Sequence, residues 1–268
     1  IFFSKVSNST LSGLENSVFL FIFSVSLSLF SQEKVSYISV SKKLLKNLIA
    51  QKDYDNELIL LEKSNLNDLV KELKTDTQKM TFWINIYNAF IQIALSQNPE
   101  EYKNKTAFFK KPRIKIASQI LSFDDIEHGI LRKSKIKISL GYLRKWFRPK
   151  WEQELRVKNL DWRIHFALNC GAKSCPPVAI YSKENLNKEL EYMTKTFLKN
   201  TTTYNVKTNT ANTVKLFFWF NADFGGSSSI KKILLDYGAT PKKVKKIIIN
   251  TYDWTLQLRN YKNFPAQI

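Results

Sequence analysis

Cysteine and histidine are scarce in this chain of 268 residues, which contains two of each. Both cysteines, Cys170 and Cys175, lie within residues 163–177 together with His165, and the second histidine, His128, lies upstream. Any thiolate nucleophile, imidazole base or soft metal site must therefore use these four residues. The sequence also has no phosphate-binding glycine loop, no HExxH and no GxSxG, which removes the commonest motifs of nucleotide-binding proteins, zinc proteases and serine hydrolases.

Acidic residues are few beside the basic ones. The chain has 23 Asp and Glu against 42 Lys and Arg, which gives a net charge of +19. Such a field attracts polyanions, so the predicted partner is an anionic envelope polymer or a membrane surface. The alternative is an ordinary solvated surface, because the basic residues are scattered along the chain in pairs. Nucleic acid is the weaker candidate, since a leader would carry the chain away from it.

The one long apolar run lies near the N-terminus, at residues 18–30 (VFLFIFSVSLSLF). It is too short for a membrane span, which needs about 20 residues, and it has the length of a signal-peptide core. We therefore predict a signal peptide or membrane leader at 1–31, a single globular domain at 32–268, and a periplasmic or secreted location. A buried core helix is the alternative. No linker rich in Pro, Gly or Ser divides the chain after residue 32.

Hydrophobic periodicity predicts more helices than strands. We expect helices over residues 33–51, 66–73, 75–97, 122–131, 185–198 and 230–237. We expect extended segments at 113–120, a buried strand at 164–168, a β-hairpin formed by 204–207 and 214–219, and a final strand at 246–250. Long helices around few short strands indicate an α+β fold, a mainly helical single domain around a small antiparallel sheet.

Residues 140–151 (LGYLRKWFRPKW) mix aromatic and basic side chains. Two interpretations are open. Such a mixture can stack on nucleic-acid bases or lie at a membrane interface. The interpretation that we favour from sequence is a helix whose aromatic side chains face the core while its cations extend to solvent.

Cys170 is the candidate catalytic nucleophile, because Gly171 permits a sharp turn that would expose the thiol. His128 is the candidate base, and Glu127 or Asp223 would orient its ring. These residues predict a thiol-dependent hydrolase or transferase, with the main-chain amides of the turn stabilising an oxyanion.

Other roles for the same residues stay open. In an oxidising compartment Cys170 and Cys175 would form a disulfide. The predicted function is then a non-catalytic envelope-binding module whose basic surface holds anionic polymers. The two cysteines and two histidines fit no usual zinc spacing, so we predict no metal and no cofactor. His165, in the predicted strand, would point away from Cys170 and is better suited to a buried structural role.

Five motifs occur in an order that resembles a known family. They are FWINIYN (82–88), LSFDDIEHGIL (121–131), RIHFALNCGAKSCP (163–176), DFG (223–225) and YDW (252–254). Over about residues 35 to 257 the chain resembles bacterial, secreted-type members of the domain of unknown function family 547. The resemblance implies no established activity, and it implies signature positions at Trp83, Asn85, Asn88, Glu127, His128, His165, Asn169 and Cys170. From these we take as candidate binding residues Trp83, Asn85, Asn88, His165 and Asn169, together with Cys175.

Overall fold

The longest helix among the described residues, α5 (Asp76–Gln97), runs through the main hydrophobic core. In the computed structural model, which describes residues 36–267, this helix begins at a capping box. The Thr75 side chain accepts a hydrogen bond from the Gln78 amide, and the Gln78 side chain accepts one from the Thr75 amide. The helix ends before Pro99, which cannot continue it. Both ends match the prediction for residues 75–97.

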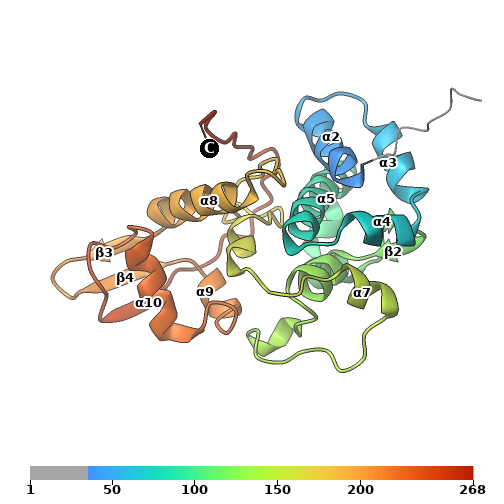
Figure 1. Ribbon diagram of the computed structural model, residues 1–268. Helices are drawn as coiled ribbons and strands as arrows, with labels where there is room; N and C mark the ends of the chain where they lie inside the picture. The colour runs from blue at the N-terminus through green and yellow to red at the C-terminus, as the bar shows by residue number, and fades with distance from the viewer. Residues whose placement is uncertain (1–35, 268) are drawn as a thin grey trace, which may run out of the picture. The chain divides into compact units, whose positions relative to one another are not determined.

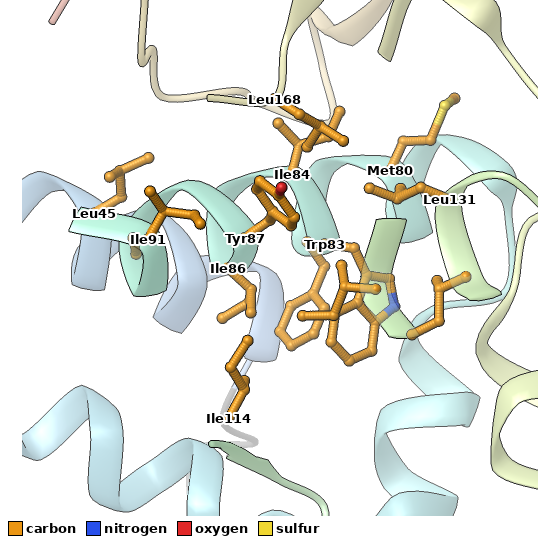
Figure 2. Close-up of a cluster of buried hydrophobic side chains, with 14 of the residues drawn as sticks. Leu45, Met80, Trp83, Ile84, Ile86, Tyr87, Ile91, Ile114, Leu131 and Leu168 are labelled. Atoms are coloured by element: carbon orange, nitrogen blue, oxygen red, sulfur yellow. The ribbon is translucent and has the colours of Figure 1, made fainter. Parts of the chain in front are cut away.

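Helix α5 is buried on almost every face, because helices pack around it and a hairpin adds to its core. Its side chains Trp83, Ile84 and Tyr87 are at most 1% exposed, and Figure 2 shows them among neighbours from other elements, including Leu45 and Ile114. Helix α2 (Tyr37–Ile49) packs along α5, and α3 (Asp55–Glu62) and α4 (Leu66–Glu72) follow it in sequence. A helix buried all round belongs to the interior of a domain.

The remaining helices are short except for α8 (Leu186–Thr201) and α10 (Gly226–Asp236). A π-helical turn, η2 (Asp125–Leu131), follows Ser122, whose hydroxyl accepts a hydrogen bond from the Asp125 amide. The other short helices are η1 (Pro99–Lys103), α6 (Lys105–Lys110), η3 (Lys137–Ser139), α7 (Lys150–Leu155), η4 (Trp162–Phe166) and α9 (Leu216–Trp219).

The strands form two small sheets. Strands β1 (Ile114–Ile116) and β2 (Gln119–Leu121) make an antiparallel hairpin. Strand β4 (Thr210–Thr213) pairs antiparallel with β3 (Thr203–Asn205) and parallel with β5 (Lys246–Ile249). The mainly helical α+β class is therefore confirmed. The three-stranded sheet is mixed instead of purely antiparallel, because α9 and α10 form the long crossover that a parallel pair requires.

Two hydrophobic clusters make up the core. The larger surrounds α5 and includes α2, α6 and the β1–β2 hairpin. The smaller joins the end of α8 to α9, α10 and the mixed sheet. Figure 1 shows α8, α9, α10 and β3–β4 grouped together, and α2, α3, α4 and α5 grouped together. Some side chains of the larger cluster and some of the smaller one line the same cavity, which is described below.

Two predicted strands are wrong. Residues 164–168 do not form a strand, because their first part lies in the 3-10 helix η4, which begins where the Asp161 side chain accepts a hydrogen bond from the Arg163 amide. The hairpin uses 203–205 and 210–213, and residues 214–219 turn into helix α9 instead. A short apolar run does not by itself distinguish a strand from a buried helical turn.

The favoured interpretation of residues 140–151 is also wrong. Only its last two residues are helical, as the start of α7. Trp146 is 87% exposed and Phe147 is 88% exposed, so these aromatic side chains do not enter the core. Pro149 has no amide hydrogen to donate and ends the possibility of a continuous helix through 140–151.

The predicted leader at 1–31 lies outside the described residues. Within residues 36–267, no helix combines the length and the apolar character required to cross a bilayer. The described residues, 36–267, group into one unit by their internal contacts.

Candidate functional site

A cavity of about 520 Å³ brings together most of the predicted catalytic residues. Its polar lining includes Glu127, His128, His165 and the disulfide-bonded Cys170 and Cys175. Its aromatic lining consists of Tyr87, Phe109, Trp219, Phe220, Tyr252 and Trp254. Helix α5, the η2 turn, η4, α9 and the C-terminal segment all contribute side chains, so the cavity is assembled from distant parts of the sequence. A mostly apolar pocket with a few polar groups is typical of ligand-binding sites.

His128 lines this cavity, and its ring carries a buried hydrogen-bond donor. Its Nδ1 lies 2.8 Å from Nη1 of Arg132, one helical turn later, and a guanidinium can only donate. Nδ1 is therefore the acceptor, and the hydrogen of the neutral ring is on Nε2. Nε2 is buried and has no hydrogen-bond partner among the described residues, since Asp124 Oδ1 is 3.6 Å away. Burial, reinforced by Arg132 and Lys137, holds the pKa of His128 well below its usual value, so the ring stays neutral.

Asp223 does not orient His128, as the sequence suggested, but binds His165. Its Oδ2 accepts hydrogen bonds from His165 Nε2 at 2.9 Å and from Arg132 Nε at 2.6 Å. Burial alone would raise the pKa of Asp223, but these two hydrogen bonds outweigh it and lower the pKa to about 2. The carboxylate is therefore ionised. His165, Asp223, Arg132 and His128 form a continuous buried chain of hydrogen bonds, which we call the relay.

Arg132 is the residue of the relay that sequence analysis missed. Its side chain is 0% exposed, and it bonds Asp223 on one side and His128 on the other. Its guanidinium carbon lies 4.5 Å from the centre of the Phe220 ring. The one signal in the sequence was its position four residues after His128 in a helical segment, which places the two side chains on one face. A buried arginine needs such partners to offset the loss of its hydration.

The relay is packed tightly against the loop that carries Gly141. Gly141 has a φ of +88°, a left-handed conformation that favours glycine. A side chain at this position would also collide with the carboxylate of Asp223. Lys135 lies 3.6 Å from Asp223 Oδ1 and donates a hydrogen bond to the Gly141 carbonyl. The loop and the relay thus hold each other in position.

Glu127 is the second carboxylic acid of the cavity. Its Oε2 accepts a hydrogen bond from the Tyr87 hydroxyl at 3.2 Å, and its Oε1 lies 3.8 Å from His128 Nδ1. Burial raises the pKa of Glu127, the negative charge of Asp124 adds to this, and Arg132 opposes it. Asp124 itself is bonded to Lys137 at 2.8 Å. Glu127 therefore lies beside His128, as predicted, but bonds Tyr87 and leaves the ring of His128 to Arg132.

Cys170 and Cys175 are joined in a disulfide that forms part of the cavity wall. The Tyr252 hydroxyl lies 3.3 Å from one sulfur and 3.2 Å from the other, and the Cys170 amide donates to the sulfur of Cys175. Of the two roles predicted for the cysteines, the structure therefore has the disulfide, and in this state Cys170 has no thiolate. Neither sulfur is a free thiolate ligand for a metal, and no cluster of three His, Cys, Asp or Glu suited to a metal occurs within residues 36–267.

The predicted binding residues outside the cavity lining have structural contacts. Asn85 bonds the amide and carbonyl of Tyr181, and Asn88 bonds the Asn169 amide and the Ala167 carbonyl. Asn169 in turn closes the disulfide loop through Gly171 and Pro176. Trp83 is fully buried in the α5 core. These contacts use the side-chain amides to fasten the chain, so these four residues have no part in the function proposed below.

Stability between pH 4.5 and 6.5 is expected to depend on His165. Burial lowers the pKa of His165 to about 4, against 6.5 in a solvated chain, so the unfolded state takes up protons first as the pH falls. The free energy of unfolding contributed by this residue therefore decreases on acidification. In His165→Gln, urea unfolding should show a pH slope smaller by up to roughly 1 kcal/mol per pH unit.

Glu127 also contributes to the pH dependence of stability, and comparing wild type with His165→Gln removes its contribution. Its raised pKa contributes a slope of the opposite sign, since the native state keeps its proton to higher pH. That contribution is present in both proteins and cancels in their difference. Equal slopes for wild type and His165→Gln would contradict the assignment of a neutral, buried His165.

The central part of the chain matches one family model. Residues 70–198 match the family described as "Protein of unknown function, DUF547". The matched residues include α5, the η2 turn with Glu127 and His128, the disulfide and Arg132; Asp223, Tyr252 and Trp254 follow the matched segment. No curated protein and no solved structure matches the chain. The match supports the resemblance drawn from the motifs.

Proposed function

We propose that this domain, whose central residues 70–198 match a family of unknown function, is a glycan-binding module. A sugar ring of the ligand would enter the cavity of about 520 Å³. The observation that carries the proposal is the combination of an aromatic wall with a buried, unpartnered donor, His128 Nε2–H. A sugar has apolar C–H faces and a belt of hydroxyl groups, so it complements both. This develops the non-catalytic, envelope-binding interpretation of the sequence.

The aromatic wall comes from two segments of the chain. Trp219 of α9 has its ring centre 4.8 Å from that of Tyr252 and 5.6 Å from that of Trp254. Tyr252 and Trp254 are 4.7 Å apart. All three side chains line the cavity and are partly exposed, so their faces are accessible to a ligand. Aromatic side chains supply large contact areas with little loss of conformational entropy, which suits them to bind flat apolar faces.

The polar groups of the cavity suit hydroxyls, which both donate and accept hydrogen bonds. His128 Nε2–H supplies a donor. The carboxyl groups of Asp124 and Glu127, which also line the cavity, supply acceptors. Unpaired buried polar atoms cost free energy, so a ligand hydroxyl that bonds Nε2–H would recover that cost.

Charge favours an anionic glycan. The chain has a net charge of +19, and the ammonium group of Lys105, which lines the cavity, lies over the Tyr102 ring and near the Trp254 ring. Such a field speeds the encounter with a polyanion and holds its charged substituents. With the predicted periplasmic or secreted location, the ligand would be an anionic envelope polymer. Binding should therefore weaken as salt is raised.

Thiol-dependent hydrolysis or transfer is the less supported function. It requires reduction of the Cys170–Cys175 disulfide, since a sulfur bonded to sulfur is not a nucleophile. It also requires a base other than His128, because the lone pair of that ring is directed to Arg132. The prediction that Cys170 is catalytic therefore applies only to a reduced protein with a rearranged cavity.

Calorimetric titration with two oligosaccharides of equal length tests the proposal. We expect the wild type to bind oligogalacturonate more tightly than a neutral chito-oligosaccharide. Trp219→Ala should weaken binding at least about tenfold, or about 1.4 kcal/mol. Phe218→Ala is the matched control, because Phe218 is adjacent in sequence, 48% exposed and absent from the cavity lining. Equal affinities for Trp219→Ala and wild type, or no binding of either sugar, would reject the cavity as a glycan site.

The same preparation tests the thiol alternative. Isolated without reductant, the protein should not react with iodoacetamide, and its mass should be lower by the two hydrogen atoms that disulfide formation removes. Rapid alkylation of Cys170 in mildly acidic buffer would instead indicate an activated thiolate. That result would favour the hydrolase or transferase over the binding module.

A further inference from the structure

Residues 133–151, here called the basic–aromatic segment, expose large apolar side chains to solvent. Ile138 is 90% exposed, Trp146 is 87% exposed and Phe147 is 88% exposed. Tyr142 and Leu143 are more than 60% exposed. Single exposed apolar residues are ordinary, but five within ten consecutive positions form a patch, and such patches mark interaction sites.

The same segment is strongly cationic. Between residues 133 and 151 there are seven Lys or Arg and no Asp or Glu. Lys135, Lys137 and Lys145 are paired with carboxylates of flanking elements, at Asp223, Asp124 and Glu152. Lys133, Arg144 and Arg148 have no ion pair with any of the described residues. Lys150 is paired with Glu154 at 3.9 Å, so three of the seven positive charges of the segment are uncompensated.

Main-chain hydrogen bonds hold the patch in a defined shape. Lys135 and Arg144 form an antiparallel bridge, the Ile136 amide bonds the Leu143 carbonyl at 2.9 Å, and the Lys145 amide bonds the Ser134 carbonyl at 2.7 Å. Residues 137–142 thus form the tip of a hairpin-like loop, with Trp146 and Phe147 directly after its base. Gly141, packed on Asp223, anchors the tip to the relay. The apolar side chains are therefore exposed by a constrained loop.

We propose that the basic–aromatic segment docks this protein on the surface of an anionic lipid bilayer. Trp and Phe favour the interfacial region of a bilayer, and Ile138 and Leu143 would enter the acyl boundary below it. Arg and Lys beside them pair with anionic headgroups. The aliphatic side chains decide against single-stranded nucleic acid, because they offer no π-face on which a base can stack.

Docking would also place the cavity at the membrane surface. Ile138, at the tip of the segment, lines the cavity as well, so the docking surface and the cavity are adjacent. The proposal does not depend on the identity of the cavity ligand. Its test changes Trp146, Phe147, Arg144 and Arg148, none of which lines the cavity.

Quenching of tryptophan fluorescence by brominated lipid tests the proposal on the full chain. Vesicles of phosphatidylcholine with roughly one third phosphatidylglycerol should quench part of the emission, and pure phosphatidylcholine should quench far less. Residues 1–31 contain no tryptophan, so the apolar run at 18–30 does not contribute to this signal. In Trp146→Phe most of the quenched component should be lost while vesicle binding is retained. Trp146→Ala/Phe147→Ala should lower the vesicle association constant of the segment at least about tenfold.

Matched variants separate the two contributions. Arg144→Gln/Arg148→Gln should lower the association constant about fivefold per charge removed. Val206→Ala/Phe218→Ala removes exposed apolar side chains elsewhere on the protein, 75% and 48% exposed, and should change nothing. Unaltered quenching in Trp146→Phe would overturn the proposal. Tight binding of oligothymidine that Trp146→Ala/Phe147→Ala abolishes, with no quenching by vesicles, would overturn it in favour of nucleic acid.

Discussion

Replacing Asp223 with Asn is expected to lower the free energy of unfolding by roughly 3–5 kcal/mol. The side chains of Asp223 and Arg132 are both 0% exposed and lie 2.6 Å apart. Removing the negative charge leaves the guanidinium of Arg132 buried without its counter-ion, and an uncompensated buried charge is far more costly than the original pair was stabilising. The His165 Nε2–H also loses a charged acceptor. Urea denaturation monitored by circular dichroism measures the change.

An exposed aspartate supplies the control for this variant. Asp253 is outside the relay and its side chain is 45% exposed, so Asp253→Asn should leave the urea midpoint almost unchanged. The double variant Arg132→Met/Asp223→Leu removes both charges together and should recover a large part of the loss. If Asp223→Asn were as stable as wild type, the relay would not be a buried ionic network.

Replacing Asn88 with Ala is expected to cost roughly 2–4 kcal/mol of unfolding free energy. The Asn88 amide donates to the Ala167 carbonyl and accepts from the Asn169 amide, both at 2.9 Å, and the residue is fully buried. Alanine would leave one main-chain donor and one main-chain acceptor without partners. Each would then be buried without the hydrogen bond that offsets its desolvation, which destabilises the folded state. These groups border the disulfide loop, so the variant should also loosen the wall of the cavity.

Asn187→Ala separates this effect from helix propensity. Asn187 is exposed on α8, and alanine is the better helix former, so this variant should gain up to about 0.7 kcal/mol. The Asn88 variant receives the same gain within α5 and should nevertheless be destabilised. A destabilisation of Asn88→Ala below about 1 kcal/mol would show that the two main-chain groups find other partners, such as water.

Local signals in the sequence predicted both ends of α5, whereas α8 extends to Thr201 instead of 198 and α10 begins at Gly226 instead of 230. The capping box at Thr75 and the stop at Pro99 bound α5, and the side chain of Asn65 caps α4. These are interactions between residues a few positions apart, so the sequence contains all the information that they need. The strand predicted at residues 164–168 was wrong because no interaction between near neighbours in the sequence identifies this segment. Their apolar run fits a buried strand and a buried 3-10 turn equally, and only packing distinguishes them.

The sequence predicted most of the residues of the site but not the hydrogen bonds between them. Cys170 and His128 were chosen because few other residues offer a thiol or an imidazole, and Glu127 and Asp223 were chosen as carboxylates able to orient the ring; all but Asp223 line the cavity. Asp223 pairs with His165, 58 positions away, and not with His128. Arg132 gave only a weak signal, its position four residues after His128, because arginine is usually a surface residue and its complete burial is what reveals its role.

The sequence by itself determined the α+β class, the ends of α5 and the small set of residues able to form a reactive or polar site, because these depend on composition and on neighbours along the chain. Only the tertiary structure decided that the two cysteines are bonded, that Arg132 links the two histidines through Asp223, and that Trp146 and Phe147 face solvent. These features depend on which distant segments pack against one another and bury their side chains. That arrangement is set by the packing of the whole domain.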